Sequence, residues 1–199
     1  MLVPQKPPSS NRTLWIVVGA AAAITLTVVI AMSVYIVSIY QDSMERRVVI
    51  DGRTLVGADD EPIQLVRNDE AEDVSWAELR KFLLTDQTDR IRYEDDTFVC
   101  ADSAEMLFNN AEEVGINAGY VFIEFGPGET AHACNAFRTT DKGIVYVDDT
   151  GTINGIVNAD KTVELAVGDS YCPEPVFPSP GREATWECLG TVSDFTVIW

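Results

Sequence analysis

Basic residues and histidine are scarce in this sequence. Its 199 residues include 14 Lys and Arg, 32 Asp and Glu, and a single His. All 32 acids lie after Tyr40, against 12 Lys and Arg, so that part of the chain carries a net charge of about −20. Such a surface repels nucleic-acid phosphates and anionic lipid headgroups, which excludes nucleic-acid binding as a function. We interpret the acidity as a source of solubility, not as an activity in itself.

Charge of either sign is missing from residues 14–40. This uncharged run is longer than the roughly 20 apolar residues that cross a bilayer as a helix. Trp15, Tyr35 and Tyr40 lie near its ends, where aromatic side chains meet the membrane surface. No small-residue cleavage site of a secretory signal follows it. The pattern predicts one transmembrane helix, Leu14–Tyr40, that anchors the protein in the cell membrane.

The orientation of this anchor depends on the charges beside it. Lys6 and Arg12 precede the helix, and Arg46, Arg47 and Arg53 follow it, so the basic residues are nearly balanced. The acid-free tail on one side and the acidic chain on the other favour a cytoplasmic N-terminus under a membrane potential that is negative inside. We therefore expect the soluble domain to be extracytoplasmic.

Two helices are predicted beyond the anchor. Ser75 and Glu78 have the spacing of a capping box, which starts a helix that ends near Thr85. A second helix should run from Cys100 to Val114, with Gly115 as its stop. Its apolar positions share one face; they are Cys100, Ala104, Leu107, Phe108, Ala111 and Val114.

Strands follow the second helix. The runs Ile116–Phe125, Ala131–Phe137 and Ile144–Asp148 are rich in β-branched and aromatic residues and are separated by Gly-containing turns. Thr162–Val167 is a weaker fourth candidate. A helix followed by an antiparallel meander indicates an α+β domain.

The single histidine, His132, must serve any Cys–His or Ser–His catalysis in this chain. Strand alternation places it on one face with Cys134, and Asp148 shares a face of the next strand with Tyr146. If the two strands pair, His132 and Asp148 meet; a slip of one residue would bring Asp149 instead. We expect the helix that carries Cys100 to pack on this same face.

These residue types supply what acyl transfer requires. The exposed N–H groups at a helix N-terminus stabilise a thiolate, and imidazole accepts and returns the proton. A carboxylate on the other ring nitrogen orients the imidazole, and the Cys100 backbone N–H is a donor for an oxyanion. The alternative is structural, because a cysteine on an apolar helix face is usually a small buried hydrophobe.

The order of these segments resembles the transglutaminase-like superfamily, in particular a surface-exposed archaeal and bacterial branch. The runs that carry the resemblance are YEDDTFVCADSAEMLFNNAEEVGINAGYVFIEF, HACNAF and TTDKGIVYVDDTG, within residues 74–171. The resemblance implies a papain-like core, in which a helix carrying the cysteine packs on an antiparallel sheet. It implies Cys100 as the nucleophile, His132 as base and acid, and Asp148 as the orienting residue. Cys134 and Ala101 stand where many members have aromatic residues.

The other cysteines allow several states. Cys172 and Cys188, in the Pro-rich C-terminal stretch, would form a disulfide outside the cell or remain free thiols. Cys134 would pair with Cys100, or join Cys100, His132 and Asp148 around zinc. The lack of a Cys-x-x-Cys pair disfavours zinc, and no cofactor or metal is expected. The Asp148–Gly151 run misses the spacing of a calcium-binding loop and is interpreted as a turn.

The sequence thus predicts five segments. They are a disordered tail (1–13), a transmembrane helix (14–40), a linker (41–73), a transglutaminase-like domain (74–171) and a C-terminal extension (172–199). The predicted function is cysteine-dependent acyl transfer, of the peptidase, amidase or transglutaminase type, on a peptide or protein substrate. The alternative is a non-catalytic surface module that keeps the fold and binds a partner.

Overall fold

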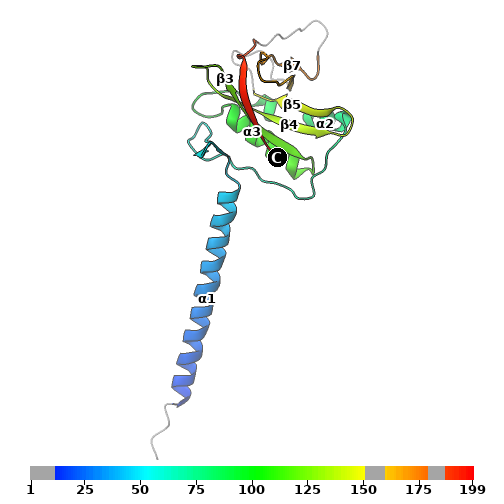
Figure 1. Ribbon diagram of the computed structural model, residues 1–199. Coiled ribbons are helices and arrows are strands. Elements are labelled where there is room, and N and C mark those ends of the chain that lie inside the picture. Colours follow the sequence, from blue (N-terminus) through cyan, green and yellow to red (C-terminus); the bar gives the residue numbers. More distant parts are fainter. Residues whose placement is uncertain (1–11, 151–159, 179–186) are drawn as a thin grey trace, which may run out of the picture. The chain divides into compact units, whose positions relative to one another are not determined.

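The computed structural model describes residues 12–150, 160–178 and 187–199. The chain divides into two units, Met1–Glu45 and Arg46–Trp199. Figure 1 shows the chain and labels several of its helices and strands. The helices and strands of the described residues are α1 (Arg12–Glu45), β1 (Val49–Ile50), β2 (Arg53–Thr54), α2 (Trp76–Leu83), the 3-10 helix η1 (Thr88–Arg90), α3 (Cys100–Glu113), β3 (Ala118–Phe125), β4 (His132–Thr139), β5 (Gly143–Asp148), β6 (Lys161–Val163), β7 (Glu174–Pro175) and β8 (Val192–Ile198).

The first unit contains the long helix α1. It covers the predicted segment 14–40 and extends beyond both of its ends, so the helix itself is confirmed. Its described large apolar side chains are exposed, among them Trp15, Leu26 and Tyr35. Among the described residues, the structure has no helix whose length and apolar character suffice for a membrane span. Insertion of α1 into a membrane stays a prediction, and residues 1–11 of the expected tail lie outside the described residues.

The second unit is an α+β domain with an antiparallel sheet, as expected, but the sheet has six strands where the sequence predicted three and a weaker fourth. The strand order is β7-β6-β5-β4-β3-β8, so the chain runs as a meander from β3 to β7 and returns to place β8 beside β3. The predicted strands match β3, β4 and β5 to within two residues at each end, and β6 is shorter than the candidate Thr162–Val167. The segment 172–199, interpreted from sequence as an extension, supplies two strands of this sheet.

Helix starts and stops follow the local sequence. Ser75 caps α2, because its Oγ accepts from the Glu78 N–H while the Glu78 carboxylate accepts from the Ser75 N–H at 2.9 Å. Helix α3 ends at Glu113, and Gly115 takes a φ of +83°, a left-handed conformation that glycine adopts without a steric penalty.

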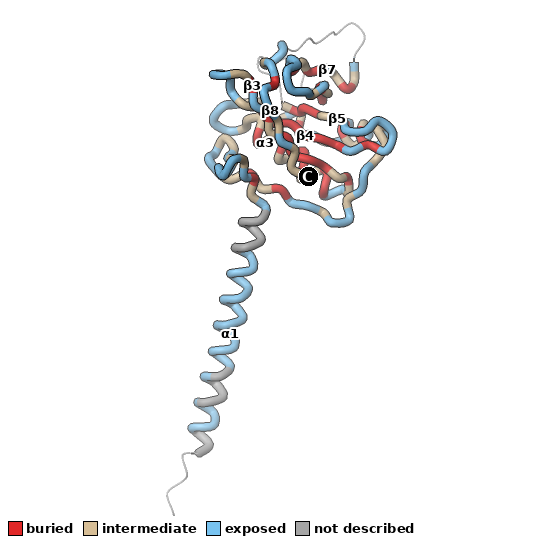
Figure 2. Tube along the Cα trace, in the orientation of Figure 1, coloured by how far each residue is buried: buried red, intermediate tan, exposed pale blue. Residues whose placement is uncertain are grey.

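The main core lies between α3 and one face of the sheet, where Figure 2 shows buried residues concentrated in α3 and the central strands. From the helix it receives Ala104, Leu107, Phe108 and Ala111, the positions that the helical spacing predicts. The predicted Val114 is instead exposed, because it lies past the last helical residue.

The helix packs on the sheet face opposite to the one predicted. Phe137 and Val147 lie in the core with α3, and Asn135 Nδ2 donates to the Ala104 carbonyl at 2.8 Å. His132 and Cys134 alternate with these residues and lie on the other face. The expectation was wrong because it assumed one apolar face. The second face has its own core, which includes Tyr171 and Val192 from the C-terminal segment.

The predicted linker, 41–73, is not one: residues 41–45 continue α1, and residues 46–73 pack against α3. Val48, Ile63 and Leu65 are buried in the main core. Backbone N–H groups of this segment donate to successive side chains along the helix. The pairs are Ala58 with Asp102, Gln64 with Glu105, Val66 with Asn109 and Asn68 with Glu112. The polar face of α3 thus holds an extended segment that has little regular structure of its own.

Candidate active site

Cys100 is the first residue of α3, as the sequence predicts. It is a free thiol of intermediate exposure. The Asp102 carboxylate accepts from the Val99 N–H at 2.8 Å, which satisfies one of the free N–H groups of the first turn and stabilises the helix start. The helix therefore presents Cys100 at the end where its backbone dipoles favour an anion.

His132 and Asp148 form a buried pair across β4 and β5. Their strands pair in the register Asn135↔Val147, which confirms the predicted pairing. The His132 Nε2 and Asp148 Oδ2 atoms lie 3.1 Å apart, and the side chains are only 8% and 2% exposed. Asp149 takes the alternate direction, so the register that would bring it to His132 does not occur.

Asp148 has three further contacts with polar groups. Its Oδ2 accepts from the Tyr171 hydroxyl at 2.9 Å, and its Oδ1 accepts from the Thr150 N–H at 2.8 Å. The Lys161 ammonium lies 3.5 Å from Oδ1 and is buried with it. These contacts fix the carboxylate plane and hence the orientation of the imidazole ring.

Tyr171 and Lys161 were missed in the sequence interpretation. Lys161 lies in β6 directly opposite Asp148, and Tyr171 lies in an irregular segment that crosses the second face of the sheet. Lys161 directly precedes the strand candidate Thr162–Val167, and this was a usable signal, because a lysine that becomes buried normally has a carboxylate partner. The position of Tyr171 gave no such signal, because it depends on the path of a long irregular segment.

The charges in this pair are mutually stabilised. Burial alone would lower the pKa of His132, but the charge and hydrogen bond of Asp148, together with the adjacent Cys100 thiol, raise it to about 10. Burial opposes ionisation of Asp148, but Lys161 and His132 hold its pKa well below the usual range. The pair is therefore an imidazolium and a carboxylate near neutral pH.

Cys100 lies within interaction distance of His132. The nearby Cys100 thiol contributes, after Asp148, to the raised pKa of His132. Because Nε2 of the ring faces Asp148, Nδ1 is the ring nitrogen that this pair does not use. The Tyr171 ring packs edge-on against the imidazole, with centroids 5.2 Å apart. The structure therefore brings together all three residues that the sequence singled out.

Two further buried side chains, a tyrosine and a cysteine, lie near this site. The Tyr120 hydroxyl, in the main core with Cys100, has no hydrogen-bond partner among the described residues, and burial raises its pKa well above the usual value. Cys134 is a free, fully buried thiol that interacts with the Tyr171 hydroxyl, and burial also raises its pKa. Cys100 and Cys134 are not joined in a disulfide.

The described residues contain no group of three or more His, Cys, Asp or Glu side chains arranged to hold a metal ion. Cys172 and Cys188, 16 residues apart in sequence, form a disulfide. Of the two states left open for these cysteines, the disulfide is therefore confirmed. The disulfide links the segment that carries Tyr171 to the chain just before β8.

Comparisons of the chain with family models, with curated proteins and with solved structures found no match.

Proposed function

We propose that this protein catalyses cysteine-dependent acyl transfer through Cys100, His132 and Asp148, on a papain-like core of the transglutaminase-like type. The observation that carries the proposal is the buried His132–Asp148 pair, 3.1 Å apart, beside a thiol at the first residue of a helix. Each of the three side chains has a role in this chemistry, and they lie on three different elements, α3, β4 and β5.

The reaction divides into two steps. In the first, the Cys100 sulfur attacks the carbonyl carbon of an amide, His132 holds the thiol proton, and the C–N bond breaks as His132 gives that proton to the leaving amine. In the second, His132 accepts a proton from water or from an acceptor amine, whose attack on the thioester releases Cys100. The developing oxyanion accepts from the Cys100 backbone N–H at the helix start. Hydrolysis needs no second substrate site, so we rank peptidase or amidase activity above cross-linking.

Asp148 acts through His132. It holds the imidazole in one orientation and stabilises its protonated form, as a triad carboxylate does. Lys161 and Tyr171 keep Asp148 ionised and fixed despite its burial. An uncompensated buried carboxylate would otherwise take up a proton, and the pair would lose its charge.

The membrane anchor is part of this proposal. The uncharged segment Leu14–Tyr40 lies within a continuous helix whose described apolar side chains are exposed. We propose that it tethers the domain on the outer side of the cell membrane. The Cys172–Cys188 disulfide supports this side, because disulfides persist in oxidising compartments. Protease treatment of intact cells should digest the domain, and protection until lysis would exclude this orientation.

The decisive experiment is alkylation of the full-length chain in an uncharged detergent. Iodoacetamide should modify Cys100, and at the same pH the His132→Ala variant should react at least tenfold more slowly, because the variant lacks the imidazole that accepts the thiol proton. Buried Cys134 is the internal control and should stay unmodified until the protein unfolds. An equal rate in both variants would contradict the proposed pair.

Turnover is measured separately with dimethylated casein and a dansylated primary amine. Peptide release or amine incorporation that disappears in Cys100→Ala supports catalysis and distinguishes hydrolysis from cross-linking. A reactive, His132-dependent thiol without turnover on any acyl substrate would favour the non-catalytic binding module instead.

A further inference from the structure

Strand β5 extends beyond the end of its neighbour β6. Strand β6 pairs with Tyr146, Val147 and Asp148 and ends at Val163, so Gly143–Val145 has no partner on that edge among the described residues. From Glu164 the chain leaves the sheet and returns to it only at β7, which pairs with β6. The backbone N–H and C=O groups on this edge of β5 are available to another extended chain.

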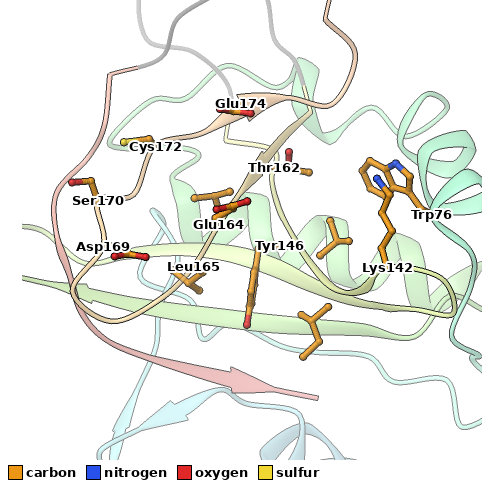
Figure 3. Close-up of a pocket in the computed structure, with 13 residues that line it drawn as sticks. Trp76, Lys142, Tyr146, Thr162, Glu164, Leu165, Asp169, Ser170, Cys172 and Glu174 are labelled. Atoms are coloured by element: carbon orange, nitrogen blue, oxygen red, sulfur yellow. The ribbon is translucent and has the colours of Figure 1, made fainter.

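A groove of about 580 Å³ opens along this edge, between β5 and the diverging chain (Figure 3). Its volume is within the range of specific ligand sites. The apolar side chains of Ile144, Val145 and Leu165 contribute to its lining. In Figure 3, Tyr146 and Glu164 lie in the middle of the groove, and Trp76 and Lys142 lie at one end.

The lining is anionic. It includes the carboxylates of Glu164, Asp169 and Glu174. The one lysine among its lining residues, Lys142, lies over the Trp76 ring, with Nζ 4.7 Å from the centroid. This cation–π contact holds the ammonium at the end of the groove, away from the three acids in the view of Figure 3. A ligand in the groove therefore meets a negative field over an apolar floor.

We propose that this groove binds an extended cationic peptide segment, which adds a strand along Gly143–Val145 and places Lys or Arg side chains against Glu164, Asp169 and Glu174. Main-chain pairing supplies affinity that does not depend on sequence, and the carboxylates select for basic side chains. The groove lies at the hairpin end of β5, whereas Asp148 is at its other end. The inference goes beyond the proposed catalysis and does not require Cys100.

Binding is measured on the full-length Cys100→Ala chain in an uncharged detergent, so that no probe is consumed. The probe is a rhodamine-labelled, end-blocked hexapeptide of alternating Val and Lys, followed by fluorescence anisotropy. The triple variant Glu164→Gln, Asp169→Asn, Glu174→Gln should weaken binding at least tenfold. The same peptide with Glu in place of Lys should not bind.

The matched control removes three charges from exposed sites outside the groove, in the triple variant Glu61→Gln, Glu70→Gln, Glu113→Gln. It should change the affinity by less than twofold. A similar loss in both triple variants would mean diffuse attraction to an acidic surface and would overturn the proposal, as would no binding to the unaltered groove.

Strand addition is tested with two N-methylated peptides. Methylating the backbone nitrogens of the Val residues, or those of the Lys residues, blocks one edge of the peptide at a time. One isomer should lose at least tenfold in affinity and the other should retain most of it, because only one edge faces β5. Full binding by both isomers would overturn pairing with the strand edge.

Discussion

The Tyr171 hydroxyl donates a 2.9 Å hydrogen bond to Oδ2 of Asp148, the same oxygen that lies 3.1 Å from the His132 ring. Tyr171 therefore links the irregular C-terminal segment to the candidate active site. Since the next residue, Cys172, is disulfide-bonded, the covalent cross-link lies directly beside this contact.

Replacing Tyr171 by Phe should lower the free energy of unfolding by about 1.5–3 kcal/mol, the usual contribution of a hydrogen bond to a charged group. The ring remains to pack against His132, so the loss reports the hydroxyl alone. Urea denaturation measures it. The control is Tyr146→Phe, whose ring is half-buried on the same sheet face, and it should cost less than about 0.5 kcal/mol. Equal costs in the two variants would contradict a specific role for the Tyr171 hydroxyl.

Because His132 is the only histidine, its ring protons give an unambiguous NMR titration. With its pKa raised to about 10, the ring should stay protonated through pH 8. In Asp148→Asn the effect of burial is no longer offset by the carboxylate, and the pKa should fall below the ordinary value of 6.5. Asp149→Asn is the neighbouring control and should leave the His132 titration unchanged.

The same pair predicts how stability depends on pH. A group whose pKa is higher in the folded than in the unfolded state stabilises the fold below its unfolded pKa, and this stabilisation is lost as pH rises. The contribution of His132 should therefore decline between about pH 6.5 and 10. A wild-type stability profile that stays flat across this window, like that expected of Asp148→Asn, would contradict a charged His132–Asp148 pair.

The local parts of the fold were predictable because their signals are short-range. The capping box of Ser75 and Glu78, the apolar spacing of α3 and the alternation in β4 and β5 all involve neighbours in sequence. Once β4 and β5 were expected to pair, the meeting of His132 and Asp148 followed from alternation alone.

The remaining features depend on long-range packing. Strand β8 pairs with β3 across about 70 residues, and the N–H groups of residues 58–68 find acceptors on α3 more than 40 residues away. Strand alternation also cannot tell which face a helix covers when both faces are apolar, so the face assigned to α3 was wrong. The contact of Tyr171 with Asp148 also depends on long-range packing and was not predicted.

The Cys172–Cys188 cross-link should stabilise the folded state. It closes a segment whose ends are 16 residues apart, and a loop of this length corresponds to about 3 kcal/mol in the chain-entropy account. The double variant Cys172→Ser, Cys188→Ser should therefore unfold at a lower urea concentration by an amount equivalent to about 2–4 kcal/mol. Reducing agent should destabilise the wild type similarly and leave the variant unchanged, and an effect on the variant would point to another thiol.

Asp149 and Asp160 are interacting carboxyl groups next to the active site, but they are not part of it. Both are buried, and neither Asp149 oxygen has a hydrogen-bond donor among the described residues. Burial, followed by the charge of Asp89, raises the pKa of Asp160 to about 7, and burial with the charge of Asp160 raises that of Asp149. Two neighbouring buried carboxylates are stable when they share a proton, so ionisation of the pair should weaken the fold as pH rises from about 4 to 7.

Asp160→Asn should remove this penalty, because the amide supplies a permanent donor in place of the shared proton. We expect a gain of about 1–3 kcal/mol at pH 8, the range for satisfying a buried polar group, and a gain that shrinks toward zero near pH 4. Thermal unfolding across this pH range measures it. The control Asp95→Asn removes one exposed charge elsewhere and should give a small gain at most. A gain in Asp160→Asn that does not vary with pH would show that repulsion within the acidic surface, not the shared proton, limits stability here.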